Sequence, residues 1–289
     1  MEKQSRLGII GGSGIYDLPE LKNSDWIHME SNFGKPSDKL LLGTLNNMPI
    51  AFLPRHGRNH QYSPGNINYK ANIEALKVTG VNKIISISAV GSLKENLIPG
   101  NLVLPDQFID NTKKRDSTFF EDDIVGHISL AKPICSELKN RIFKSSENIN
   151  VNVINNSTYI VIEGPHFSTK SESLMFKDWG ADIVGMTCMP ESKLAREAEI
   201  CYSNLSLITG FDCWKDEEQP VNAKIVIKNF NNNISKIHSI ITNLSNDENL
   251  LDDCEIGCQN SLDNAITTKL NSTNLITQKK LRNIIKRIL

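Results

Sequence analysis

A short apolar run near the N-terminus ends abruptly in a turn that carries almost no side chains, in residues 8–14 (GIIGGSG). The apolar part is typical of a buried strand. Glycines let backbone N–H groups approach an anion closely, and the Ser13 hydroxyl adds a donor. An ordinary glycine turn is the alternative for this stretch taken alone. The spacing fits neither G-x-G-x-x-G before a helix nor a phosphate loop ending in G-K-[ST], so it does not indicate a dinucleotide or a nucleoside triphosphate.

Size and charge narrow the class of protein. With 289 residues, 39% hydrophobic and 22% charged, the chain is long enough for one large α/β domain or two small ones. A formal net charge of -1 gives no long-range attraction for nucleic acid or an anionic membrane, so any anion site must be local. Residues 1–6 lack a secretory apolar core, and no apolar run is long enough to span a bilayer. We therefore expect a cytoplasmic protein with no nucleic-acid and no membrane partner.

The six cysteines are scattered along the chain, at positions 135, 188, 201, 213, 254 and 258. The closest two, Cys254 and Cys258, lie in an acidic, loop-like stretch without matching histidines. This arrangement is typical of reduced thiols in a cytosolic protein. The sequence therefore predicts no metal site.

Strand-like apolar runs alternate with segments of helical periodicity along most of the chain. Strands are expected over residues 48–53, 83–87, 159–162, 182–186 and 203–208, and helices over residues 68–79, 128–143, 172–180, 190–200 and 230–244. Residues 111–126 predict a long mobile loop that carries Phe119 and Phe120. The alternation favours an α/β fold with a largely parallel or mixed central sheet flanked by helices.

The C-terminal part differs in composition from the rest. Residues 1–245 contain no internal repeat and no linker, and are expected to form one domain. Residues 246–289 are expected to form an extension, in which a polar and loose connector reaches to about residue 274. Residues 279–289 then form an amphipathic helix with Leu281, Ile284 and Ile285 on one face. We expect this helix to dock on the body or on a second subunit, with a membrane-surface helix as the alternative.

Basic side chains follow the strand at residues 48–53, in residues 54–60 (PRHGRNH). Loops after strand ends are where α/β proteins place ligand-binding groups. Arg55 is expected to bind a phosphate in bidentate fashion, with His56 as a second donor. The strand at residues 83–87 also ends in small polar residues. Ser88 and the N–H groups after it are therefore expected to form a third wall of an anion pocket. A solvated basic loop is the alternative.

Taken together, these strand ends resemble the 5′-methylthioadenosine phosphorylases, a family of the trimeric purine nucleoside phosphorylase superfamily. The matching stretches occur in unbroken order over residues 5–245: GIIGGSG (8–14), FGKPSD (33–38), RHGRNH (55–60), NYKANI (68–73), AVGSL (89–93), DQFID (106–110), EGPHFS (163–168), WGAD (179–182), MTCMPE (186–191) and FDCWK (211–215). The resemblance implies one α/β domain assembled as a homotrimer, with inorganic phosphate as co-substrate and no cofactor.

The resemblance also implies a role for particular residues. The phosphate-site positions are Ser13, Arg55, His56, Ser88, the Ala89 backbone and Thr187. The nucleoside-site positions are Met186 under the ribose, Phe167 and Ser168 at the purine, Asp212 at the exocyclic amine, Ala223, Val226 and Ile227 around the 5′-methylthio group, and His127 from a neighbouring subunit. Arg55, His56 and Asp212 are the residues expected to act in catalysis.

The implied chemistry is phosphorolysis of 5′-methylthioadenosine to adenine and 5-methylthioribose 1-phosphate. Breaking a purine–ribose bond leaves positive charge on the sugar and negative charge on the base. A phosphate held against the anomeric carbon stabilises the sugar cation and then captures it. Fixed donors in a dry pocket keep that phosphate in place.

Two positions depart from the family pattern. Gly210 stands where most adenine-specific members have an aspartate that engages purine N7, and His166 stands where arginine is usual and could pair with Glu163. Three hypotheses therefore stay open. They are 5′-methylthioadenosine phosphorolysis, phosphorolysis of a 6-oxopurine nucleoside such as methylthioinosine or inosine, and a non-catalytic protein that binds a nucleoside or phosphate. The Asp212 carboxylate argues against the second, because it would repel a purine O6.

Overall fold

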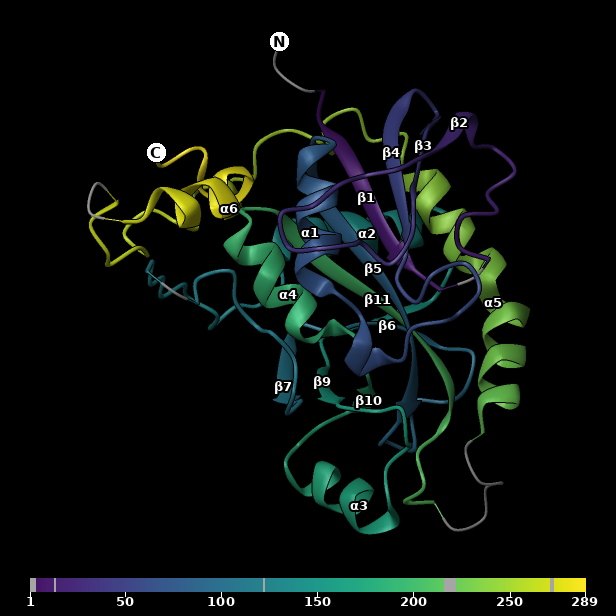
Figure 1. Cartoon of the computed structure of the whole chain (residues 1–289). Coiled ribbons are helices and arrows are strands. Elements are labelled where there is room, and N and C mark those ends of the chain that lie inside the picture. The colour runs from purple at the N-terminus through teal and green to yellow at the C-terminus, as the bar shows by residue number, and fades with distance from the viewer. Residues whose placement is uncertain (1–3, 13, 122, 216–221, 271–272) are drawn as a thin grey trace.

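A computed structural model describes residues 4–12, 14–121, 123–215, 222–270 and 273–289 of the chain. Figure 1 shows a central twisted sheet with helices on both of its faces. Among the described residues, eleven strands form this one mixed sheet. The α/β fold with a central mixed sheet, expected from the sequence, is confirmed.

The strands are β1 (Arg6–Gly11), β2 (Lys22–Ile27), β3 (Leu40–Leu45), β4 (Met48–Pro54), β5 (Val81–Ser92), β6 (Leu102–Leu104), β7 (Gln107–Asn111), β8 (Val153–Asn155), β9 (Thr158–Ile162), β10 (Ile183–Gly185) and β11 (Cys201–Phe211). The helices are α1 (Tyr69–Val78), α2 (Ser136–Asn148), α3 (Lys170–Asp178), α4 (Cys188–Glu197), α5 (Ala223–Leu244) and α6 (Leu275–Ile285), with short 3₁₀ turns η1 (Pro64–Asn66) and η2 (Cys258–Asn260). A membrane-crossing helix, which would need a longer and more apolar span, is absent from the described part of the chain.

Strand β5 organises the sheet. It lies parallel to both β1 and β11, and its last residues pair antiparallel with β10. The sheet runs β2-β3-β4-β1-β5-β10-β9-β7, and β11 branches from β5 to pair with β6, which pairs with β8. Because β1, β4, β5 and β11 run in the same direction, the loops after them open at the same edge of the sheet.

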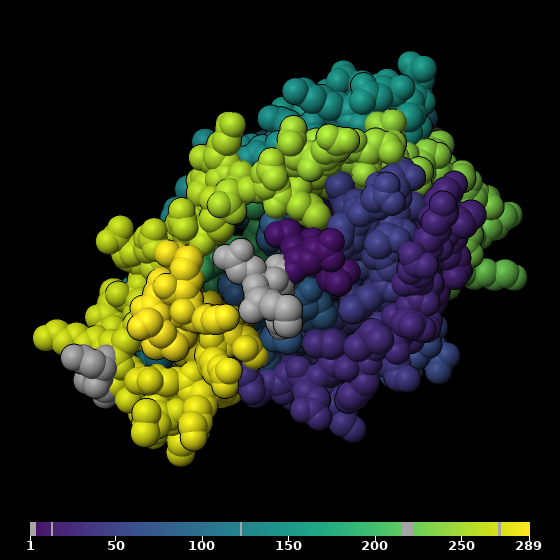
Figure 2. Space-filling model, turned by 90° about the horizontal axis from the view of Figure 1, so that it is seen from above, coloured from purple at the N-terminus to yellow at the C-terminus, as the bar shows by residue number. Residues whose placement is uncertain are grey.

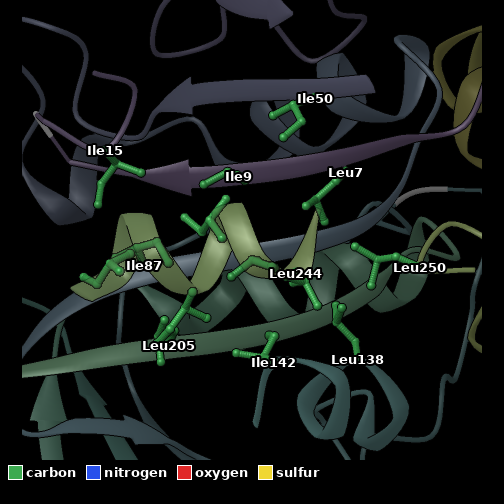
Figure 3. Packing of buried hydrophobic residues seen from close by; sticks show 14 of the residues in the cluster. Leu7, Ile9, Ile15, Ile50, Ile87, Leu138, Ile142, Leu205, Leu244 and Leu250 are labelled. Carbon is green, nitrogen blue, oxygen red and sulfur yellow. The ribbon is translucent and has the colours of Figure 1, made fainter. Parts of the chain in front are cut away.

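Both faces of the sheet are covered, so its central strands are apolar on both faces. On one face, α2 and α5 pack against Leu7 and Ile9 of β1 and Leu205 of β11 (Figure 3). On the other face, α1, α4 and α6 pack against Ile10 of β1 and Tyr202 of β11. Successive residues of a strand point to opposite faces, which is why Ile9 and Ile10 belong to different clusters.

Helix boundaries follow local capping. Helix α1 begins near its predicted position because the Asn68 side chain accepts a hydrogen bond from the Ala71 N–H. The predicted helix over residues 128–143 is wrong at its start, since α2 begins only at Ser136. Pro133 disfavours helical backbone before it, and the Cys135 side chain accepts from the Leu138 N–H at the true N-cap.

The expectation of a loose connector up to residue 274 is wrong. Five of its residues are at most 5% exposed, namely Leu250, Cys254, Cys258, Leu262 and Ala265. They recur every three or four positions within a polar majority, which conceals them from an argument based on composition. Leu250 joins the same cluster as α2 and α5 (Figure 3). The loop over residues 111–126 is anchored too, because Phe119 and Phe120 are buried.

Helix α6 docks on the body of its own chain, as the sequence predicts, although it begins at Leu275 rather than 279. Leu281, Ile284 and Ile285 are buried in the cluster that contains α1 and α4. Arg287, just after the helix, forms a 2.6 Å ion pair with Glu199. Seen from above, the C-terminal segment forms one side of the molecule (Figure 2).

Shortening a side chain on the buried face of α6 should destabilise the whole fold. Ile284 is fully buried, so Ile284→Ala removes apolar contacts and leaves a cavity that costs about 2–4 kcal/mol of unfolding free energy. Ile276, on the same helix, is 74% exposed, and Ile276→Ala should change stability by less than about 0.5 kcal/mol. Urea unfolding of the two variants measures both values. Equal losses would show that α6 does not pack on the body in solution.

Candidate active site

Arg55, directly after β4, is the buried centre of the site. Its side chain is 2% exposed, and it forms a two-pronged ion pair with Glu191 of α4, with Nε to Oε2 at 2.8 Å and Nη2 to Oε1 at 3.1 Å. It also donates to the Ser86 hydroxyl and to the Ile87 carbonyl of β5. Tyr202 of β11 donates to Glu191 at 2.9 Å. The pair therefore ties together β4, β5, β11 and α4.

The charge state of Arg55 is secured by this pairing. Burial alone lowers the pKa of a guanidinium, but the charge and hydrogen bonds of Glu191 outweigh it and leave the pKa of Arg55 above its usual value. These contacts use four of the five N–H groups of the side chain. One N–H on Nη1 remains for a ligand. The sequence-based expectation of a bidentate phosphate clamp is thus reduced to a single donor and a fixed positive charge.

Two hydroxyls meet beside Arg55. The oxygen of Ser88, on β5, lies 3.5 Å from that of Thr187, which precedes α4. Asn204 of β11 donates to the Ser88 oxygen at 3.0 Å, so the hydroxyl hydrogen of Ser88 is available to donate elsewhere. Thr187 occupies the N-cap position of α4, yet its side chain caps no backbone N–H. One of these hydroxyls can donate to the other, and the remaining O–H donor suits an anion. Ala89, the next residue of β5, is partly exposed here.

His56 lies against the same wall. Its Nδ1 bonds the Tyr62 carbonyl at 2.8 Å, and its ring stacks on His60 with centroids 4.4 Å apart. Burial and the neighbouring Arg55 charge lower the pKa of His56 to about 4, so the ring is neutral at pH 7. A neutral ring that donates from Nδ1 has an acceptor at Nε2. His56 therefore becomes a second donor only when it takes up a proton.

The glycine turn reaches the same edge of the sheet. The Arg55 N–H donates to the Gly11 carbonyl at 2.9 Å, which places the end of β1 beside the end of β4. A Cβ on Gly12 would meet nothing within 4 Å, so the turn is open at this point. Gly14 has a φ of +89°, which disfavours other residues. Ser13, expected in the phosphate site, lies outside the described residues.

The base end of the site is a group of buried polar atoms. Asp212 follows β11 and is 4% exposed, and its Oδ2 has no hydrogen-bond partner among the described residues. The same holds for the hydroxyls of Ser168 and Ser173. Burial raises the pKa of Asp212, and the nearby hydroxyls of Ser173 and Ser168 oppose this without reaching hydrogen-bond geometry. Unpaired buried acceptors and donors of this kind can take a partner such as a ligand or an ordered water.

Apolar side chains lie exposed close to these groups. Phe167 is 42% exposed beside Ser168, and Met186 is partly exposed beside Thr187. Gly164 has a φ of +67°, and a Cβ there would meet the Met186 sulfur at 2.6 Å. Position 210, by contrast, is open, because a Cβ on Gly210 would meet nothing within 4 Å.

The first two turns of α5 border the end of β11. The Asn229 side chain donates to the Thr209 carbonyl at 2.7 Å, which holds α5 next to Gly210. On these turns Ala223 is exposed, Val226 is partly exposed and Ile227 is 55% exposed. These three apolar side chains thus remain available for an apolar ligand group.

His127 is not brought to this group within one chain. It is exposed, and its backbone N–H donates to the Ala265 carbonyl of the C-terminal segment. A place for His127 in the site of a neighbouring subunit stays a prediction.

Arg115 is a positioning residue that sequence analysis missed. It sits in a charged loop that suggested a solvated surface, yet its side chain is 1% exposed. It pairs with Glu163 at 3.1 Å and donates to the carbonyls of Met186, Met189 and Ile162. Arg115 thus supplies the partner of Glu163 that His166, an exposed residue, does not. In the sequence, the only sign of such a residue was Glu163, whose usual arginine partner is replaced by His166.

The cysteines are scattered along the sequence, but most of them are close together in space. Four of the six, Cys135, Cys201, Cys254 and Cys258, are buried with their sulfur atoms within 4.8 Å of one another. They come from segments far apart in the sequence, so their spacing gave no sign of it.

Comparison with known proteins now defines the class. The family model of the phosphorylase superfamily matches residues 6–246, and the chain belongs to that superfamily.

Particular relatives narrow the class further. The chain is 47% identical to the S-methyl-5′-thioadenosine phosphorylase of Nitrosopumilus maritimus, covering 92% of this chain and 99% of that protein. It is 42% identical to the enzyme of the same name from Bradyrhizobium diazoefficiens, covering 99% of each. Among solved structures, a methylthioadenosine phosphorylase from an antarctic soil metagenomic library aligns with a TM-score of 0.92 at 41% identity, covering 98% of this chain and 99% of that one. The Schistosoma mansoni methylthioadenosine phosphorylase in complex with adenine aligns with a TM-score of 0.81 at 34% identity, covering 84% and 91%.

The neutral state of His56 predicts a pH dependence of stability. The native pKa of about 4 is below the ordinary 6.5, so between these pH values the unfolded chain binds more protons. Stability should therefore fall as pH falls through this window, by on the order of 3 kcal/mol from this group. His56→Gln should remove that part of the dependence. Urea unfolding at pH 4.5 and at pH 7 measures the loss of stability in the unmodified protein and in His56→Gln. An equal loss in both proteins would contradict the prediction.

Proposed function

We propose that the protein catalyses phosphorolysis of S-methyl-5′-thioadenosine to adenine and 5-methylthioribose 1-phosphate. The observation that carries the proposal is the buried Oδ2 of Asp212, which has no partner among the described residues. A carboxylate oxygen accepts hydrogen bonds, so it suits the exocyclic amine of adenine. The relatives named S-methyl-5′-thioadenosine phosphorylase support the same substrate.

Strand β5 sets the distance between the two ends of the substrate. We call the donors of Arg55, Ser88 and Thr187 the anion wall, which lies at one end of the site. At the other end, the Ser92 carbonyl accepts from the Asp212 N–H at 2.9 Å. Four residues of extended strand span about 13 Å. A ribose then lies between the phosphate and the purine, next to Met186, and the ring of Phe167 lies against the purine. The 5′-methylthio group meets Ala223, Val226 and Ile227.

The reaction follows from these positions. The C1′–N9 bond breaks with its electron pair moving to the purine, and a phosphate oxygen forms the new bond to C1′. The hydroxyls of Ser88 and Thr187 and the remaining N–H of Arg55 hold the phosphate against the developing sugar cation. His56 takes up a proton as the dianion approaches, because a nearby negative charge raises the pKa of its ring. Asp212 holds the leaving adenine, and water in the open space at Gly210 relays a proton from bulk solvent to N7.

The proposal extends to assembly and co-substrate. Inorganic phosphate is the second substrate and no cofactor takes part in the reaction. The chain acts as a cytoplasmic homotrimer in which His127 of each subunit completes the site of its neighbour. The exposed position of His127 is compatible with such a role.

Release of adenine should depend on phosphate. Purified protein mixed with S-methyl-5′-thioadenosine should produce adenine only when phosphate is added, as followed by chromatography. Arg55→Ala should lower kcat/KM for phosphate by about 10²-fold or more while the Kd for the nucleoside changes little. Equal losses in both would contradict the place assigned to Arg55.

Two other outcomes would identify the alternatives. Release of base from methylthioinosine but not from S-methyl-5′-thioadenosine would show a 6-oxopurine enzyme. Tight nucleoside binding without release of any base would show a non-catalytic protein. Either result would overturn the proposal.

Gly210→Asp tests the departure from the family pattern. The position is open, so an aspartate should fit without loss of stability. If water now serves N7, a fixed carboxyl group should raise kcat on S-methyl-5′-thioadenosine by about 10-fold or more. Gly210→Asn is the matched control, because it has the same size and cannot supply a carboxyl proton. An unchanged kcat in both variants would show that N7 is served elsewhere.

A further inference from the structure

Four buried cysteines face one another at a place far from the candidate active site. We call this group the cysteine cluster; its members are Cys135, Cys201, Cys254 and Cys258. Cys201 begins β11 and Asp212 follows its end, so about 33 Å of extended strand separates the two places. Cys135 precedes α2, and Cys254 and Cys258 belong to the segment after α5. The cluster therefore joins three separate parts of the chain.

The distances fit ligands around one ion. The Cys254 sulfur lies 3.6 Å from that of Cys135 and 3.7 Å from that of Cys258, and all four lie within 4.8 Å of one another. Zinc–thiolate bonds of about 2.3 Å in a tetrahedron place the sulfur atoms about 3.8 Å apart. Four sulfur ligands are the set that zinc takes in structural sites.

Positive groups surround the cluster. The ammonium of Lys83, a residue that is 2% exposed, lies 3.8 Å from the Cys201 sulfur. The Arg196 guanidinium donates to the Cys258 sulfur at 3.6 Å. The Leu138 N–H, at the N-terminus of α2, donates to the Cys135 sulfur at 3.4 Å. Four thiolates around a divalent ion carry a net charge of about -2, which these two cations balance.

The local backbone also suits a metal ligand pair. Cys254 and Cys258 are separated by three residues, within the spacing found for paired zinc ligands. The chain turns between them at Gly257, which has a φ of +78° and donates to the Cys254 carbonyl at 2.9 Å. Only glycine adopts this backbone freely.

We propose that the cysteine cluster binds one zinc ion as a structural tetrathiolate site that attaches the C-terminal segment to the body. All four ligands come from the protein, so no position is open for substrate. Each thiol loses its proton when the ion binds. The ion would link the segment after α5 to β11 and α2, next to the core that Leu138 and Leu250 share in Figure 3.

Metal analysis of the purified protein tests the proposal. The full chain is purified with a reductant and without chelator. Plasma emission spectrometry should then find about one zinc ion per chain. Mercurial titration should release that zinc, and cobalt loaded in its place should show the absorption bands of a tetrahedral tetrathiolate. Removal of zinc by a strong chelator should lower the Tm.

Variants separate the cluster from the other thiols. Cys258→Ala should lower the zinc content to background, whereas Cys213→Ala, which changes a cysteine outside the cluster, should retain it. If Cys258→Ala does not fold, the mercurial titration of the unmodified protein still decides. Four free thiols without metal, two disulfides found by mass spectrometry, or iron in place of zinc would each overturn the proposal.

Discussion

The buried ion pair between Arg55 and Glu191 is the interaction on which the site depends. Removing two charges from water is costly, and such a pair is tolerated only when its remaining hydrogen-bonding capacity is satisfied. Here Ser86, Ile87 and Tyr202 complete the network. The pair thereby fixes α4 against the end of β4 and the middle of β5, and Thr187 against Ser88. The anion wall is a consequence of this arrangement.

The approach of these side chains was predictable from sequence only in part: parallel strands open their loops at one edge, but β5 continues four residues beyond Ser88. Arg55 and Ser88 each follow or end an apolar run, and the structure bonds Arg55 to the Ile87 carbonyl and places the next residue, Ser88, beside Thr187. The protein partners of Arg55 were not predictable, since Glu191 lies far along the chain on a helix face. The role of Arg115 was not predictable either, because its loop is charged and only the fold buries its side chain. The cysteine cluster depends on three segments meeting, which no spacing records.

Some matching stretches support the site instead of lining it. The Asn72 side chain exchanges two hydrogen bonds with Ser37, and Asn68 donates to the Phe33 carbonyl at 2.8 Å. The loop before β3 is thus held on α1, next to the chain that follows β4. Residues 33–38 and 68–73 therefore have a structural reason for their composition, independent of any ligand. The residues that we propose to bind phosphate and purine lie on the same scaffold.

A crystal structure of the protein with sulfate and adenine would test most directly whether one anion wall and one purine acceptor share this edge of the sheet. We expect the sulfate oxygens to bond to the hydroxyls of Ser88 and Thr187 and to Nη1 of Arg55. We also expect the adenine amine to donate to Oδ2 of Asp212, with Phe167 against the purine ring. Sulfate bound away from Ser88, or adenine bound without contact to Asp212, would contradict these expectations.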